Sequence, residues 1–308
     1  MRKIILTAYI CCLLISCDLR HQAIDLPYDD EPSKLCMDAI LSTTDTITVS
    51  VYLSGTLREY RDLINSELYQ PSSIKVTAYE DSIWLDTLSR TKLPNNCCYF
   101  NWKSLSGKKP QAGHSYYFVV SADGFETIYN TPVRVPEPVP LNPNITIVDS
   151  IGVYEGDGGP DVNQIISSLS FTFNDPANQS NYYSFYVAAY NADSIDLGLS
   201  ANIDNIMGCK SSGWKPTFSD VCFDGKTVQV NIPVRSFYGN FKLRDAAYLT
   251  IGIVNLSYED YLFWETYVDQ PVDVEDAIFR EPYNTYSNVQ NGYGIVSTSS
   301  VSTLTIQP

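Results

Sequence analysis

The residues of this sequence that could do thiol, metal or nucleophilic chemistry are its eight cysteines and two histidines. Cys209 and Cys222 flank a turn-rich segment and form a candidate disulfide. Cys36 lies in an apolar run and is interpreted as a small buried side chain. Cys97 and Cys98 are adjacent, so on a strand they point to opposite faces, which argues against both serving one metal ion. Because the sequence has no C-x-x-C pair, we expect no metal site and no cofactor.

No pattern typical of an active site is present. The sequence has no G-x-S-x-G motif, and a catalytic triad would have to use His21 or His114. The 35 acidic residues are plentiful, but spacing singles out no pair of carboxylates for glycoside hydrolysis. We therefore expect a protein that is not an enzyme, with an envelope glycan-active enzyme as the weaker alternative.

Cys17 has a different setting. The apolar run of residues 4–15 follows two basic residues and is shorter than the roughly 20 residues that span a bilayer. Small Ser16 then precedes Cys17, a pattern that resembles the lipid-attachment signal of bacterial lipoproteins. It predicts that residues 1–16 are a signal peptide and that Cys17 is acylated, with palmitate-like chains on its sulfur and amine. These chains would anchor the protein in a lipid bilayer.

Charge and composition narrow the possible partners and the possible fold class. The net charge is −15, so phosphate-rich nucleic acid and anionic lipid headgroups are excluded as partners. Tyrosine is abundant, with 23 residues, and valine, isoleucine and threonine are frequent. Such side chains suit pleated, half-buried surfaces, and the composition predicts an all-β protein. No second apolar stretch is long enough for a transmembrane helix.

The positions of prolines and the alternation of apolar and polar residues divide the chain into predicted domains. The polar residues 17–34 are predicted to be a lipidated tether. Alternating strands such as 46–54 predict an N-terminal immunoglobulin-like β-sandwich over residues 35–135. A proline-rich linker follows at 136–145, and residues 146–308 are predicted to form a larger antiparallel β domain.

The larger domain contains two local exceptions to strand alternation. In residues 257–268 Ser257 can cap a helix and apolar residues recur at helical spacing, which predicts one short amphipathic helix. Its aromatic residues are interpreted as core rather than as a ligand box. The glycines of "QNGYG" at 290–294 favour a hairpin turn over close backbone approach to a partner.

Several segments together resemble a known family. They are Cys17 with "IDL" (24–26), "PSKLCMDAIL" (32–41), "FNDPANQSNYYSFYV" (173–187), "FSDVCFDGKTVQVNI" (218–232) and "SNVQNGYGIV" (287–296). In this order, with the expected helix at Ser257, they look like the DUF 4249 lipoprotein family of Bacteroidota over nearly the whole mature chain. The insertion around 57–70 departs from the family pattern, and so does Tyr293-Gly294-Ile295-Val296.

The resemblance implies an outer-membrane lipoprotein, of a kind often encoded beside a TonB-dependent, SusC-like transporter. The expected function is therefore that of a non-catalytic binding or accessory partner of such a transporter in nutrient uptake, with the ligand left open. A structural or adhesive cell-surface lipoprotein is the alternative. The resemblance transfers no catalytic residues, and the sequence leaves open whether the anchored body faces the periplasm or the medium.

A second resemblance concerns glycosylation. Asp-Ser or Asp-Thr followed by an aliphatic residue is similar to the O-glycosylation acceptor of Bacteroidota, and composition alone would give about one or two such sites. The alternative interpretation is that these pairs mark strand ends. The five candidate acceptors are Thr46, Ser82, Thr87, Ser150 and Ser194.

Overall fold

The structure is a computed structural model, and Ser33–Pro308 form one unit by their internal contacts, separate from Met1–Pro32. The residues that it describes are 32–54, 70–92, 100–154, 162–193, 196, 199–201, 203, 205–211, 216–236, 242–267 and 285–308.

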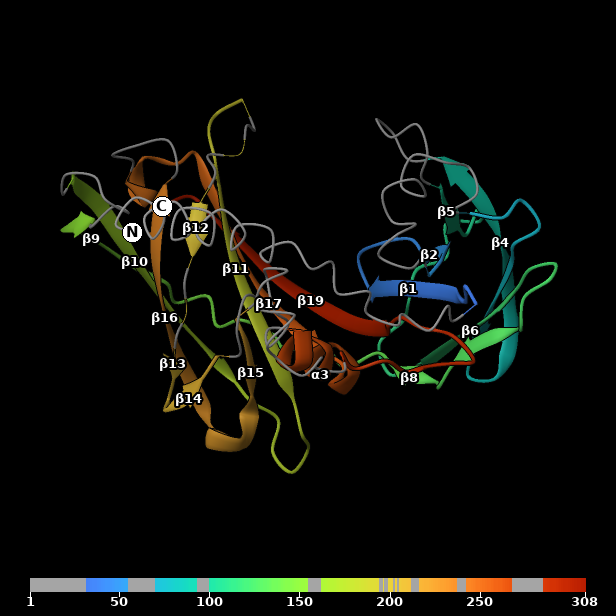
Figure 1. Ribbon diagram of the computed structural model, residues 1–308. Helices are drawn as coiled ribbons and strands as arrows, with labels where there is room; N and C mark the ends of the chain where they lie inside the picture. Colours follow the sequence, from blue (N-terminus) through green and yellow to red (C-terminus); the bar gives the residue numbers. More distant parts are fainter. Residues whose placement is uncertain are drawn as a thin grey trace, which may run out of the picture. The chain divides into compact units, whose positions relative to one another are not determined.

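Eight strands lie within residues 35–134 (Figure 1). They are β1 (Leu35–Ser42), β2 (Thr48–Leu53), β3 (Lys75–Glu80), β4 (Ile83–Lys92), β5 (Phe100–Lys103), β6 (Ser115–Ser121), β7 (Ile128–Asn130) and β8 (Val133–Arg134).

Residues 146–308 contribute the remaining strands, one α-helix and two short 3-10 helices within the described residues. The strands are β9 (Thr146–Tyr154), β10 (Val162–Asn174), β11 (Tyr182–Tyr190), β12 (Leu199–Ala201), β13 (Asn205–Ile206), β14 (Cys209–Lys210), β15 (Thr217–Ser219), β16 (Thr227–Ser236), β17 (Tyr248–Leu256), β18 (Val289–Gln290) and β19 (Val296–Ile306). The helices are α3 (Tyr258–Tyr267), η3 (Asp220–Cys222) and η4 (Leu243–Asp245).

Most strands join one large curled sheet. Its order is β15-β11-β17-β19-β1-β2-β5-β4-β3-β6-β7-β18, with β8 paired to β6. The sheet turns at β4, whose first part pairs with β3 while its last residues pair with β5. The all-β prediction is therefore confirmed, with a single α-helix in the described part of the chain.

The first core follows the predicted alternation. Ile47, Val49 and Val51, from the predicted strand 46–54, are 1%, 0% and 0% exposed. They pack with residues of β1, β3, β5 and β6, including Trp102 and Phe118. Since successive side chains of a strand point to opposite faces, the residues between them face outward.

The second core lies between two β layers. A four-stranded sheet of order β12-β16-β10-β9 packs against β11 and β17 of the large sheet. The ring of Phe173 lies 5.1 Å from that of Tyr183 and 5.8 Å from that of Phe185. On the opposite face of β11, Tyr182 stacks on Tyr261 of α3 at 4.6 Å, whereas Tyr186 is 37% exposed, so this face is covered only in part.

β19 belongs to both halves. Its first residues pair in parallel with β1, from Ala39↔Val296 to Ser42↔Ser299. The following residues pair antiparallel with β17, up to Leu249↔Ile306. In Figure 1 it is the long red strand that passes from β17 to β1.

The predicted linker is mostly exposed but is attached to the rest of the protein at single residues. Val139 is 3% exposed and belongs to the second core. The side-chain Nδ2 of Asn255 donates to the backbone oxygen of Glu137 at 2.9 Å. In addition, β18 of the predicted C-terminal domain pairs with β7 of the predicted N-terminal one. Within the described residues, no helix is long and apolar enough to cross a membrane.

Candidate functional site

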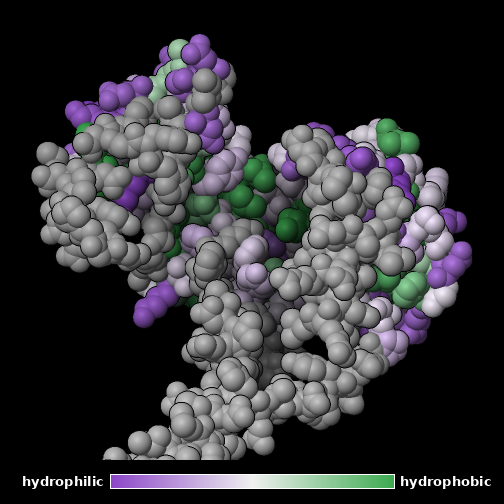
Figure 2. Space-filling view, turned by 45° about the horizontal axis from the view of Figure 1, so that its top comes forward, coloured by the Kyte–Doolittle hydropathy of each residue, from purple (hydrophilic) through white to green (hydrophobic). Residues whose placement is uncertain are grey.

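A cavity of about 880 Å³ lies where three separate segments of the chain meet. β1 and β2 contribute Asp38, Ile40 and Tyr52. α3 contributes Phe263, Trp264 and Tyr267. The rest of the lining comes from the chain between Thr285 and Ile295. Hydrophobic residues are also seen gathered in a hollow of one face in the space-filling view (Figure 2).

Two glycines bring the third segment against β1. A Cβ on Gly292 would lie 2.3 Å from the backbone oxygen of Leu35, and one on Gly294 would lie 2.1 Å from that of Met37. Gly294 also has φ +123°, which side chains rarely adopt. The N–H of Met37 donates to the backbone oxygen of Tyr293 at 2.9 Å. The glycines therefore allow two segments of the same chain to lie close together, and the prediction of a hairpin turn is wrong.

The same segment is braced by its own side chains. Asn288, 3% exposed, donates from Nδ2 to the backbone oxygen of Val296 at 2.8 Å. Its Oδ1 accepts from the N–H of Val296 at 2.9 Å. Ser287 donates its hydroxyl to the backbone oxygen of Gly294 at 2.7 Å. These bonds hold the wall in one conformation without help from a ligand.

α3 is fixed at its first turn. Ser257 Oγ accepts from the N–H of Asp260 at 3.3 Å, which is the helix cap predicted for this residue. It also accepts from the N–H of Thr298 at 3.2 Å. Buried Asp260 accepts at Oδ1 from the Ser297 hydroxyl at 3.2 Å. Both contacts attach the start of the helix to β19.

The end of α3 is attached to the returning chain. Thr266 donates its hydroxyl to the backbone oxygen of Leu262 at 2.9 Å and accepts from the N–H of Tyr286 at 2.8 Å. Burial raises the pKa of Tyr286, and the nearby Glu259 carboxylate raises it further. The Tyr286 hydroxyl therefore stays protonated and available for hydrogen bonding.

The aromatic residues of α3 form one wall. The Phe263 and Tyr267 rings lie 5.5 Å apart at 22°, nearly parallel. The Trp264 ring stands at 82° to the first and 78° to the second. None of the three is fully buried, and Tyr267 is 47% exposed. The interpretation of these aromatics as core is wrong, and the helix has no buried apolar face because its one fully buried residue is Asp260.

Asp38 supplies the charge of the cavity. Its Oδ1 accepts from the N–H of Ile295 at 3.1 Å. Its Oδ2 accepts from the Tyr52 hydroxyl. Among the described residues that line the cavity, Asp38 is the only charged one, and none is Lys, Arg, His or Cys. The site can therefore offer ring faces, a carboxylate and hydroxyl groups to a ligand.

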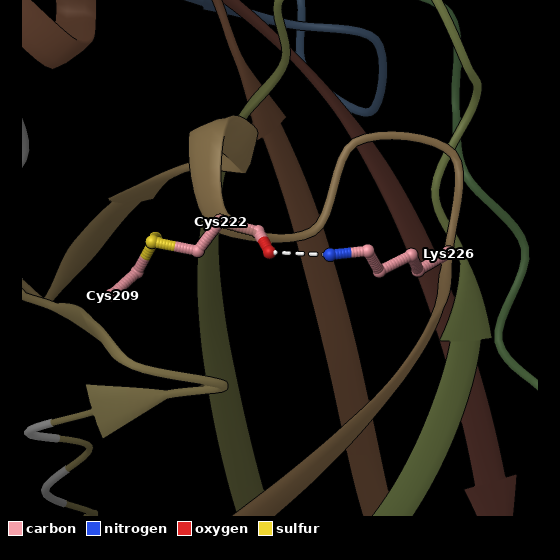
Figure 3. The surroundings of a disulfide bond; sticks show 3 residues. All are labelled: Cys209, Cys222 and Lys226. Atoms are coloured by element: carbon pink, nitrogen blue, oxygen red, sulfur yellow. Dashed lines mark hydrogen bonds between the residues drawn. A yellow bond between two sulfur atoms is a disulfide. The ribbon is translucent and has the colours of Figure 1, made fainter.

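The predicted disulfide lies outside the lining of the cavity. Cys209 of β14 and Cys222 of η3 are bonded, with their Cα atoms 5.8 Å apart (Figure 3). Lys226 donates from Nζ to the backbone oxygen of Cys222 at 2.9 Å, as the figure shows. Cys36 is a buried free cysteine, as expected. Cys17, Cys97 and Cys98 lie outside the described residues.

The glycosylation candidates are scattered. Ser82, Thr87 and Ser150 are exposed, and Thr46 is half-buried. Ser82 lies in the turn between β3 and β4, whereas Ser150 lies on β9 and donates to the backbone oxygen of Ile166 at 3.1 Å. Ser194 lies outside the described residues. The structure does not bring these residues to one surface site, and their glycosylation stays a prediction.

A second polar cluster was missed by sequence reasoning. Asp175, Asp220 and Asp224 each place a carboxylate oxygen within 4.8 Å of the others. Asp175 accepts from the Tyr183 hydroxyl at 2.6 Å, and Asp220 accepts from the N–H of Asn181 at 2.7 Å. Burial raises the pKa of Asp220. The cluster joins β11 to the turn before β16, and its buried carboxylates already accept bonds from the protein.

A family model described as "Domain of unknown function (DUF4249)" matches residues 20–305. The chain belongs to the DUF4249 family. No curated protein is significantly similar to this DUF4249 chain. Similar solved structures include two of the beta-glucuronidase (GUS) of Parabacteroides merdae, one with glycerol in its active site. Each is 10% identical, with a TM-score of 0.21 over 73% of this chain. The DUF4249 chain spans only 23% and 24% of those two chains.

Proposed function

We propose that this DUF4249 protein is a non-catalytic binding lipoprotein that works with an outer-membrane TonB-dependent transporter in nutrient uptake. The aromatic cavity between β1, α3 and the 285–295 segment carries the proposal, because large, partly apolar cavities with a few polar groups are typical ligand sites. Its walls are fixed by intramolecular hydrogen bonds, so a ligand would meet a preformed site.

The anchor is the second part of the proposal. The setting of Cys17 predicts acylation, and the polar residues that follow it would give the body reach above the membrane surface. A net charge of −15 would keep that body from adhering to anionic lipid. A lipid-held binding protein could then pass its ligand to a neighbouring transporter.

Two measurements test the anchor and the partner. Mass spectrometry of the native N-terminal peptide should find acyl chains on Cys17, and Cys17→Ala should release the protein from membranes. The full-length protein, extracted in mild detergent, should co-purify with a barrel identified by its peptides as a TonB-dependent transporter. A bare Cys17 thiol, or purification as a lone monomer, would contradict the proposal.

A third measurement tests the cavity. Trp264→Ala and Tyr267→Ala should impair growth on the transported nutrient while leaving protein abundance unchanged. Trp84→Ala is the matched control, because Trp84 is a 60% exposed aromatic on β4 that does not line the cavity. Equal growth of all three variants and the wild type would exclude the cavity from uptake.

A further inference from the structure

We infer that the aromatic cavity binds an organic cation, an ammonium group carrying apolar substituents. This inference rests on the proposed binding function and names the ligand class of the same site. It is carried by the ring walls, by the single carboxylate of the lining, and by a lysine of the chain that already contacts one of the rings.

The walls offer several ring faces to one ligand. Six of the fourteen lining residues are aromatic. On α3, Trp264 stands nearly perpendicular to Phe263 and Tyr267, so the helix presents faces in two directions. Ring faces carry negative partial charge and attract cations, most strongly where water is excluded. Rings that meet at an angle around one space are the arrangement by which proteins hold quaternary ammonium groups.

The charge of the lining has one sign. Among the described residues of the lining, Asp38 is the only charged one, so an anionic ligand would meet a carboxylate there, while Lys34, outside the lining, already binds the Tyr293 hydroxyl. The bonds from Tyr52 and Ile295 hold this carboxylate in place. A net charge of −15 would further steer cations toward the body.

A sugar fits the lining less well. Sugars need many directional hydrogen bonds, yet no Asn, Gln, Arg or His lines the cavity among the described residues. Of the two aliphatic hydroxyls there, Ser287 donates its proton to Gly294. The remaining lining is aliphatic, aromatic or glycine backbone.

Lys34 shows that a ring of this cavity accepts an ammonium. Its Nζ lies 5.0 Å from the centroid of the Tyr293 ring and 3.2 Å from the Tyr293 hydroxyl. Lys34 is not part of the lining. It would therefore compete with a ligand cation for this ring and repel it, so removing the lysine charge should strengthen binding.

The test compares choline with 3,3-dimethylbutan-1-ol, which has the same shape but carbon in place of the charged nitrogen. Binding to the purified full-length protein in mild detergent is measured by tryptophan fluorescence and by saturation-transfer NMR. Choline should bind about tenfold more tightly than the neutral alcohol, which corresponds to the range of a desolvated cation–ring contact. Methyl glucoside and acetate serve as the sugar and anion probes and should bind more weakly than choline.

Variants assign the effect to the cavity. Tyr267→Ala and Asp38→Asn should each weaken choline binding about fivefold or more, and Asp38→Asn should reduce the ratio of choline affinity to neutral-alcohol affinity. Lys34→Met should strengthen choline binding. Trp84→Ala, the exposed control, should change nothing. Thermal unfolding of each variant checks that the fold is intact.

The outcomes separate this inference from the proposed function. Equal binding of choline and the neutral alcohol, or no saturable choline binding, would overturn the organic-cation assignment. If methyl glucoside binds instead and Tyr267→Ala abolishes that binding, the ligand class is wrong while a binding function stands. If no probe binds and the cavity variants support normal uptake, the proposed function fails as well.

Discussion

Gly294 lies so close to Met37 that a Cβ on the glycine would be 2.1 Å from the backbone oxygen of the methionine. That oxygen cannot move without displacing β1, and the φ of +123° at Gly294 strains any other residue. We expect Gly294→Ala to lower the free energy of unfolding by about 3 kcal/mol and to weaken ligand binding to the cavity. Chemical denaturation and fluorescence titration measure the two effects.

Gly107→Ala is the control for this prediction. Gly107 has φ +70°, but a Cβ there would meet nothing within 4 Å. Only the backbone preference is lost, so its cost should be about 1 kcal/mol. Equal losses in the two variants would show that the contact with β1 contributes nothing.

The buried carboxylate of Asp175 should be essential for stability. It accepts from the Tyr183 hydroxyl at 2.6 Å and from the N–H of Gly225 at 2.8 Å. Asp175→Ala leaves both donors without this acceptor and should cost about 3 kcal/mol in urea unfolding. Asp224 is exposed and accepts from the backbone N–H of Asn178, and Asp224→Ala should cost less than about 1 kcal/mol. A larger loss of stability in Asp224→Ala than in Asp175→Ala would contradict this prediction.

Asp220 should give the stability a pH dependence. Burial raises its pKa above the ordinary 3.8, so between these two values the folded state binds more protons than the unfolded state. The free energy of unfolding contributed by this group is therefore highest below 3.8 and falls as the pH rises through the folded-state pKa. Asp220→Asn should remove that part of the slope. Urea unfolding of both proteins over this pH range makes the comparison, and parallel curves would refute it.

The disulfide should stabilise the turn region that it closes. Cys209 and Cys222 are 13 residues apart, and closing a loop of this size contributes about 3 kcal/mol by restricting the unfolded chain. The double variant Cys209→Ala/Cys222→Ala should have a free energy of unfolding lower by this amount, as measured by urea denaturation. Dithiothreitol should produce a similar loss in the wild type and no change in the double variant. An effect of the reductant on the double variant would point to another disulfide.

The Cys36 thiol should be inert in the folded protein. Burial raises its pKa to about 12, and the Asp38 charge adds to the shift. Since the thiolate is the reactive form, iodoacetamide should not label the Cys36 peptide near neutral pH until the protein is unfolded. The same shift makes stability fall as the pH rises above 9.0. Labelling of the Cys36 peptide under native conditions, detected by mass spectrometry, would contradict this prediction.

Local patterns predicted local structure well. The alternation of Ile47, Val49 and Val51 indicated a strand with one buried face, and Ser257 indicated where a helix begins. The Cys209–Cys222 pair was predictable because the turn-rich segment between them brings two nearby positions together. These features depend on residues close in the sequence, whose geometry is set by the backbone itself.

The cavity depends on long-range pairing that no local pattern contains. Asp38 and Ile295 are 257 residues apart, and they meet because β19 pairs in parallel with β1. On an alternating strand Asp38 resembles any outward-facing residue. The aromatic spacing of α3 fits a core as well as a cavity wall, and only the position of the 285–295 segment distinguishes them. The glycines of "QNGYG" were the one available signal, since two glycines so close together can mark a tight backbone approach.

The sharing of β19 has a consequence for the order in which the two cores can be completed. β1 is made early and its parallel neighbour is made late, so the first hydrophobic core, which includes Val289 and Val296, is completed only when the end of the chain has been synthesised. The same late strand completes the layer that begins with β11 and β17. Both sheet regions are therefore completed by the same last strand, and the completion of one core is coupled to that of the other.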